Sequence, residues 1–128
     1  MQIGSEIMSI KESGEMYLET ILVLSKNSKN VRAIDICEYM DFSKPSVSRA
    51  LKKLSKEGYI SVNEMGYISL IGEGKKIAEK IYERHTVITK ALIYLGVDEN
   101  TAQLDACKIE HDISDKTFKC IKKKLIKN

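Results

Sequence analysis

The sequence predicts a mainly α-helical protein: a winged helix-turn-helix domain followed by a helical domain. Three observations support this prediction. Apolar residues recur at helical spacing through most of the chain. Two short helical segments meet at a tight turn over residues 41–43, and an alternating apolar and polar segment with a glycine turn follows them over residues 59–70. The 128 residues, 43% hydrophobic and 30% charged, are typical of one helix-rich folded protein.

Two helices are predicted before residue 41. Residues 14–25 have helical periodicity, and the polar run 26–30 that follows contains turn-forming residues. Residues 32–40 repeat the pattern before a break at 41–43. Because Cys37 lies on the apolar face of the second segment, we expect its side chain in the core.

A third helix is predicted after Ser43, a small polar residue of the kind that caps helices. Pro45 falls in the first turn, where its missing N–H costs nothing, and Gly58 ends the helix. The exposed side is cationic, with five basic residues before the first acid: Lys44, Arg49, Lys52, Lys53 and Lys56. As the second helix of a helix-turn-helix pair, this segment is the predicted reading helix, and its charge suits a phosphate backbone.

A β-hairpin is predicted next, because the runs 59–63 and 67–70 alternate apolar and polar residues around Gly66. A hairpin in this position is a wing. Winged helices serve several purposes, so the fold alone indicates double-stranded DNA as the partner without establishing it.

The glycines of residues 72–74 mark the predicted boundary between a DNA-binding domain over 1–73 and a helical domain over 74–128. A long helical pattern follows the boundary, and Asp98 and Ser114 are expected to cap two further helices. These helices bury little by themselves. We therefore expect a homodimer, which would hold two reading helices at the half-sites of a palindromic operator. The lysine-rich run on the last helix is interpreted as a solvated face.

A candidate metal site is formed by Cys107, Glu110 and His111, whose spacing places three donor side chains on one face of a helical turn. On the first helix, Met16 and Glu19 offer a thioether and a carboxylate three residues apart. The simpler alternative is that all of these are ordinary helix residues, with Cys107 and His111 structural.

The three cysteines share no spacing, which argues against a disulfide framework and favours a reducing compartment. The sequence shows no export signal and no apolar run long enough to span a bilayer. We therefore expect a cytoplasmic protein.

Several motifs together resemble the diphtheria-toxin-repressor family of metal-dependent transcription regulators, including its manganese-repressor branch. The resemblance covers about residues 13–125, and its motifs are EMYLET at 15–20, SKPSVS at 43–48, GEGKK at 72–76, RH at 84–85 and CKIEH at 107–111. It implies a metal-dependent repressor that controls metal homeostasis and is not an enzyme. The chain ends where the iron-responsive members continue into an SH3-like domain, so we expect the two-domain form.

The resemblance implies a primary metal site like that of the iron-responsive branch, formed by Met16, Cys107, Glu110 and His111. His85 matches the start of that branch's ancillary site, but Thr89 and Gln103 stand where a further carboxylate and histidine are expected. Glu19 and His85 resemble ligands of the manganese branch instead, so they are further candidates.

The start of the reading helix matches the family's DNA-contacting stretch at Ser43, Pro45 and Ser46, and at position 49, where the family uses a different polar residue. Arg49 would either read a guanine or hold a phosphate, and the sequence leaves both open. With the neighbouring polar and basic residues, the predicted DNA-binding set is Ser43, Lys44, Pro45, Ser46, Ser48, Arg49, Lys52 and Lys53.

The sulfurs of Met16 and Cys107 favour Fe²⁺ over Mn²⁺, with Mn²⁺ as the alternative and Co²⁺, Ni²⁺ or Zn²⁺ as substitutes in vitro. A winged-helix regulator without metal control remains an alternative. A metalloenzyme is disfavoured because the sequence shows no nucleophile-and-base arrangement, and the cationic helix argues against a protein-binding adaptor. No small organic ligand is expected, and no membrane partner.

Overall fold

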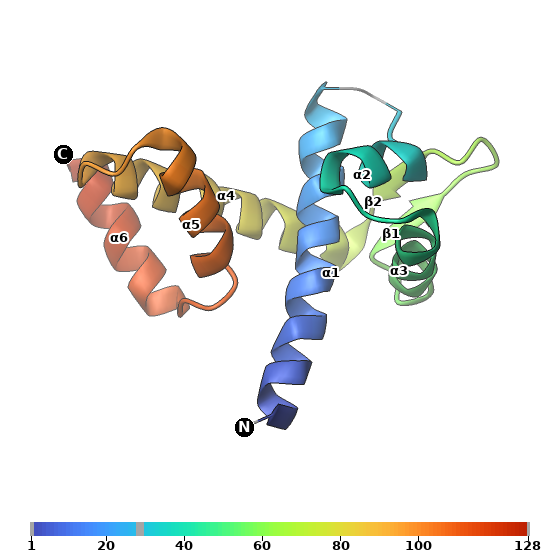
Figure 1. Cartoon of the computed structure of the whole chain (residues 1–128), viewed down its shortest axis with the longest axis horizontal. Helices are drawn as coiled ribbons and strands as arrows, with labels where there is room; N and C mark the ends of the chain where they lie inside the picture. Colours follow the sequence, from blue (N-terminus) through green and yellow to red (C-terminus); the bar gives the residue numbers. More distant parts are fainter. Residues whose placement is uncertain (1, 28–29, 128) are drawn as a thin grey trace. The chain divides into compact units, whose positions relative to one another are not determined.

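The chain forms two compact units, residues 1–79 and 80–128. The computed structural model describes the backbone of residues 2–27 and 30–127 and the side chains of residues 13–27 and 30–126. The predicted mainly helical fold is confirmed, with a helix-turn-helix, a small hairpin wing and a helical domain (Figure 1). No helix among the described residues is long and apolar enough to cross a membrane.

The N-terminal unit contains three helices and a two-stranded sheet, and it also includes the start of a fourth helix. In chain order these are α1 (Gln2–Asn27), α2 (Ala33–Met40), α3 (Lys44–Lys56), β1 (Ile60–Val62), β2 (Ile68–Leu70) and α4 (Gly72–Tyr94). Its core is formed by apolar side chains from all three helices and the hairpin, including Leu18, Ile21, Ile36, Val47, Leu51 and Ile60. Cys37 is buried in this core, as expected.

Helix α1 starts earlier than the sequence analysis predicts. The prediction begins the helix at Gly14, whereas the helix begins at Gln2. A glycine inside a helix costs only about 1 kcal/mol, and residues 2–13 contain no proline, so nothing local ends the helix there.

The helix-turn-helix is built as the capping signals predict. Asp41 adopts a left-handed conformation with φ 56°, which ends α2. The side-chain oxygen of Ser43 accepts a hydrogen bond from the backbone N–H of Ser46 at 3.3 Å, and Pro45 lies in the first turn of α3. One face of α3 is buried through Val47, Leu51 and Leu54, so the opposite face is left for solvent or a partner.

The wing is a short antiparallel hairpin in which β1 pairs with β2. The side-chain oxygen of Asn63 accepts the backbone N–H of Tyr67 at 2.9 Å, and Gly66 adopts φ 83°, which closes the turn. The N–H of Ile68 donates to the carbonyl of Val31 at 2.8 Å, so the segment before α2 adds a bridge to the hairpin. The wing is thus fixed to the helix-turn-helix by backbone hydrogen bonds.

Helix α4 packs closely against the segment between α3 and β1 because of one glycine. A Cβ atom at Gly74 would overlap the carbonyl group of Tyr59. The same carbonyl accepts a hydrogen bond from the N–H of Ile71 at 3.1 Å, so it has little freedom to move away. Gly74 is therefore required for this packing. Both glycines, at 72 and 74, lie in the first turn of α4 and not, as the sequence had predicted, before the helix.

The helical unit consists of the remainder of α4 together with α5 (Glu99–Ile109) and α6 (Asp115–Lys127). Asp98 and Ser114 cap α5 and α6 as predicted, by accepting the backbone N–H groups of Thr101 and Thr117. The core is small, with Ile88, Ala106 and Phe118 at its centre. Several large apolar side chains of this unit remain exposed: Ile93, Tyr94, Leu95, Leu104 and Ile126.

The buried guanidinium of Arg84 holds the turn between α5 and α6. Its Nη1 donates to the carbonyl oxygens of Glu110 at 3.0 Å and Ile113 at 2.8 Å. Its Nη2 forms an ion pair with Asp115, and the guanidinium carbon lies 5.5 Å from the ring centroid of Phe118. One side chain of α4 therefore fixes the backbone on both sides of this turn.

We expect Gly74→Ala to lower the free energy of unfolding by about 1–3 kcal/mol, because the added methyl group requires Tyr59 or α4 to shift. Gly14→Ala is the matched control, since nothing lies within 4 Å of its Cβ position in the helical interior of α1. The control should be neutral or stabilising by up to about 1 kcal/mol. Chemical denaturation compares the two, and equal stabilities would contradict the packing role of Gly74.

Asp115→Asn should lower the melting temperature at neutral pH and lose this effect in acid. The hydrogen bonds of Asp115 with Lys80 and Arg84 hold the pKa of its carboxyl below the usual value. The carboxylate therefore contributes stability above the unfolded pKa, and this contribution disappears as the pH falls through the lower, folded pKa. Asp112→Asn, an exposed carboxylate for which the described residues show no ion pair, is the control. Thermal melts in chelator at both pH values test this, and a difference that persists in acid would refute it.

Candidate metal centre

Three potential metal ligands meet inside the helical unit. The Nδ1 atom of His85 on α4 lies 2.9 Å from Oε2 of Glu110 and 3.8 Å from Sγ of Cys107 on α5. One donor atom from each of these residues lies within 4.8 Å of the others. A nitrogen donor from α4 thus meets a sulfur and an oxygen donor from the end of α5, which is a suitable donor set for a first-row transition ion.

The predicted single helical turn for Cys107, Glu110 and His111 is corrected by the structure. Helix α5 ends at Ile109, so Glu110 is its C-cap and His111 lies in the following turn. The cap residue keeps helical backbone angles, and its N–H donates to the carbonyl of Ala106 at 2.9 Å. Cys107 and Glu110 therefore retain the helical relation, while Nε2 of His111 lies 3.5 Å from Oε1 of Glu110.

The side chain of Glu110 gives the strongest indication of a metal site, because this residue is almost completely buried, with 1% of its surface exposed. Its Oε2 pairs with His85, but its Oε1 accepts no hydrogen bond among the described residues. The nearby guanidinium of Arg84 bonds to the backbone carbonyl of Glu110 and not to this carboxylate. A buried carboxylate with an oxygen that accepts no hydrogen bond favours a bound cation.

The ring of His85 responds to the negative groups around it. Its hydrogen bonds to Cys107 and then to Glu110 raise its pKa from 6.5 to about 10, against the opposing effect of burial. At neutral pH the ion-free cluster therefore holds a proton on His85. A metal ion would displace this proton and take over the same charge-compensating role.

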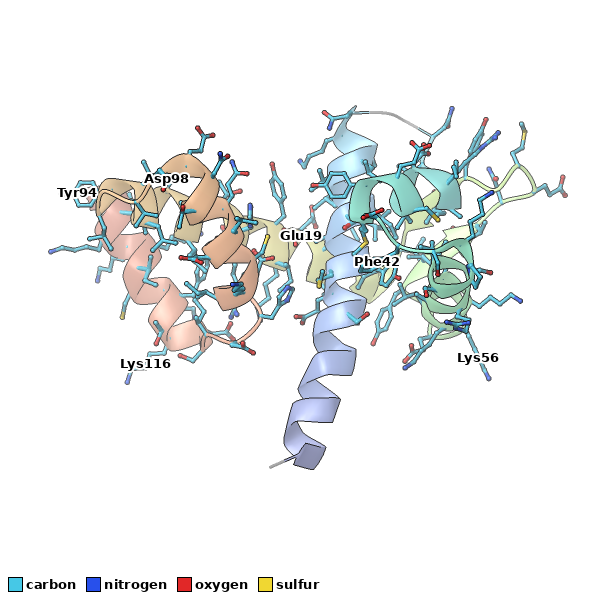
Figure 2. All side chains as sticks on the ribbon, viewed as in Figure 1. Glu19, Phe42, Lys56, Tyr94, Asp98 and Lys116 are labelled. Atoms are coloured by element: carbon cyan, nitrogen blue, oxygen red, sulfur yellow. The ribbon has the colours of Figure 1, made fainter. Side chains whose placement is uncertain are left out.

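The candidate ligands Met16 and Glu19 lie three residues apart on α1, in the N-terminal unit, and Figure 2 labels Glu19. Gln103, which stands where the iron-responsive branch has a histidine, directs its amide toward Glu99 at 3.4 Å. Thr89 is enclosed in the helical unit, with its hydroxyl oxygen buried.

Nearly all the predicted DNA-binding residues lie on the exposed face of α3 or at its cap. Those exposed are Ser43, Lys44, Pro45, Ser48, Arg49, Lys52 and Lys53, and Ser46 is half-buried. The Ser43 hydroxyl is occupied by the capping bonds to Ser46. In the part of the chain that the structure describes, none of the four cations of this set forms an ion pair, so their charge is available to a polyanion.

The structural role of Arg84 was not predicted from the sequence, where this residue was noted only as part of a family motif. The sequence nevertheless contained an indication of this role. Arg84 lies three residues after Ile81 and four before Ile88, within the buried stripe of α4. A cation in an apolar stripe must be paired and hydrogen-bonded, so its position indicated a structural contact.

The comparisons with known proteins agree with this geometry. Residues 9–68 match the family model described as the iron dependent repressor, N-terminal DNA binding domain. Residues 72–127 match the iron dependent repressor, metal binding and dimerisation domain.

Individual relatives of the chain are also transcriptional regulators. The chain is 32% identical over 115 residues to an HTH-type transcriptional regulator of Methanocaldococcus jannaschii, a match that covers 88% of this chain and 92% of that protein. It is also 32% identical over 102 residues to the transcriptional regulator MntR of Escherichia coli O6:H1, covering 80% of this chain and 66% of MntR.

Among solved structures, the manganese regulator SloR superposes with a TM-score of 0.76 at 27% identity. This match covers 88% of the chain and 53% of SloR, so the chain spans about half the length of that protein. With both family models matched in order along one chain, the protein belongs to the iron-dependent repressor family, whose members are metal-dependent transcriptional regulators and not enzymes.

Proposed function

We propose that this member of the family is a repressor activated by Fe²⁺, that it binds palindromic operators as a homodimer, and that it controls metal homeostasis. The observation that carries the metal dependence is the buried Glu110 carboxylate, placed between His85 and His111 with Cys107 alongside. Because the partner is DNA, we place its action in the cytoplasm.

The proposed preference for Fe²⁺ over Mn²⁺ is based on the sulfur ligand Cys107. Cys107 is exposed at the edge of the cluster, with its Sγ 3.8 Å from the ring of His85. A thiolate is a softer ligand than a carboxylate, and sulfur donors shift affinity away from Mn²⁺ toward Fe²⁺ and the later ions. Mn²⁺ is the second candidate, because the chain resembles a manganese regulator, SloR.

We further propose that Met16 and Glu19 of α1 complete the ligand set, on the strength of their sequence positions alone. An ion held both by α1 and by the helical unit would fix the orientation of the reading helix α3. A typical coupling between two such ligands is about 1–3 kcal/mol. Metal binding would thereby be converted into DNA affinity.

A homodimer follows from the family's dimerisation domain and from the surface of the helical unit. Its exposed large apolar residues, among them Ile93, Tyr94 and Leu104, are unusual for a surface in contact with water only. A two-fold dimer would present two reading helices to half-sites about 34 Å apart, one turn of the duplex. The operator would then be palindromic.

The alternative is a winged-helix regulator without metal control, in which Cys107 and His111 are structural. Selection of duplexes from a random-sequence pool separates the two functions, with parallel selections in Fe²⁺, in Mn²⁺ and in chelator. We expect inverted repeats to be enriched only when metal is present. Equal enrichment of the same sequences in chelator would establish the alternative.

Cys107→Asp should shift the activating preference from Fe²⁺ toward Mn²⁺, because a hard oxygen replaces a soft sulfur. His111→Ala should abolish activation by either ion. Cys120→Ser is the matched control, since it changes an exposed cysteine on α6, outside the cluster. Duplex affinity is measured with each ion in turn. An unchanged ion preference in Cys107→Asp, or activation that survives in His111→Ala, would contradict the proposed ligands.

Lys52→Ala and Lys53→Ala should each flatten the dependence of log affinity on log salt by about one unit, because each exposed side chain neutralises a phosphate. The preference for the selected operator should persist. Lys90→Ala removes another exposed cation, from α4, and should leave the slope unchanged. Variants that keep the slope but lose sequence preference would show that these lysines read bases instead.

A further inference from the structure

Helix α6 has a charge that neither the fold nor the metal centre uses. It contains six lysines and one acidic residue, Asp115. The formal charge of the whole chain is only +3, so the rest of the chain carries a slight excess of acid. Residues 1–79, which include the reading helix, contain as many acidic as basic residues. The net positive charge of the protein therefore resides on α6.

The lysines are concentrated on one side of the helix. Phe118 is buried and Ile121 and Leu125 are half-buried, so these three residues mark the face that packs inward. Successive residues turn by about 100°, which places most lysines on the opposite side. This lysine face consists of Lys116, Lys119, Lys123 and Lys124, all of them exposed, and Figure 2 labels Lys116 at the start of the helix. The side chain of Lys127 lies outside the described residues.

Within the described chain the lysine face has no acidic partner. The α6 lysine that forms an ion pair is Lys122, whose Nζ lies 2.7 Å from Glu83, and Lys122 is outside the face. Asp115 is taken by Lys80 and Arg84. No acid occurs between residues 116 and 127, whereas a solvated helix usually mixes both signs.

This arrangement is unfavourable for the helix itself. Lys116 and Lys119 are separated by three residues, and Lys119 and Lys123 by four, so like charges lie on adjacent turns. Such pairs destabilise a helix. A negatively charged partner that spans several turns would remove the repulsion, and a regular row of phosphates has that form.

We propose that the lysine face of α6 is a second DNA-contacting surface, which binds the phosphate backbone of duplex DNA without regard to sequence. The inference rests on the proposed function to the extent that DNA is the partner. An anionic membrane fits less well, because an amphipathic helix enters a bilayer through its apolar face. In α6 that face is occupied by packing of Phe118 against Ile88 and Ala106.

The test compares two double variants of the full chain. Lys119→Gln combined with Lys123→Gln removes two charges from the lysine face. Lys90→Gln combined with Lys108→Gln removes two exposed charges elsewhere in the same unit. Affinity for a mixed-sequence duplex is measured in chelator over a range of salt concentrations, with circular dichroism and sedimentation to confirm unchanged folding and assembly.

We expect the α6 double variant to lose about 1.8 units of the salt slope, since each phosphate contact contributes about 0.9. The control pair should retain the wild-type slope. Equal slopes for the α6 variant and the wild type would overturn the inference, as would equal losses in both pairs. Binding of the wild type and of the α6 double variant to phosphatidylserine vesicles is measured in parallel. If the α6 double variant loses vesicle binding but keeps its duplex binding, the inference is overturned in favour of a membrane.

The outcome can be separated from that of the proposed function. If metal stimulates operator binding and the α6 variant keeps the full slope, the metal-dependent function stands and the second surface is refuted. If the α6 variant loses slope on the mixed-sequence duplex while metal has no effect on the wild type, the second surface is supported and the metal-dependent function fails.

Discussion

Burial of the Arg84 guanidinium is the constraint on which the helical unit depends. A buried cation must find acceptors, and Arg84 finds them in the carbonyls of Glu110 and Ile113 and in the carboxylate of Asp115. These contacts set the path of the chain between α5 and α6. The next residue on α4 is His85, whose ring reaches the side chain of Glu110. One turn of α4 therefore fixes both the backbone and the carboxylate of Glu110, the central residue of the candidate metal cluster.

The same cluster contains a group that can compensate its negative charge. The buried carboxylate of Glu110 needs positive charge nearby, and a proton on His85 supplies it, because Cys107 and Glu110 raise the pKa of that ring to about 10. A divalent ion bound at the cluster would replace the proton and add a second charge. Metal and proton would therefore compete for one position, whereas the hydrogen bonds of the Arg84 Nη1 atom to the carbonyls of Glu110 and Ile113 do not involve it.

Local signals made much of the fold predictable, and tertiary contacts account for the differences. Ser43, Asp98 and Ser114 cap their helices as predicted, because a cap depends on neighbours three residues away. The cluster partners of His85 lie 22 and 25 residues away, and helical spacing indicated only Cys107, Glu110 and His111, while His85 came from the resemblance. The requirement for Gly74 depends on the carbonyl of Tyr59, which no local pattern reveals.

Thermodynamic linkage gives the most direct test of the central claim, that an ion at the Glu110 cluster and DNA at the reading helix are coupled. The affinity for Fe²⁺ or Mn²⁺ should be measured by titration of the free protein and of the protein saturated with its selected operator. DNA must tighten ion binding by the same factor by which the ion tightens DNA binding, about 5- to 150-fold for couplings of this kind. Ion affinities that are identical with and without the operator would contradict the account.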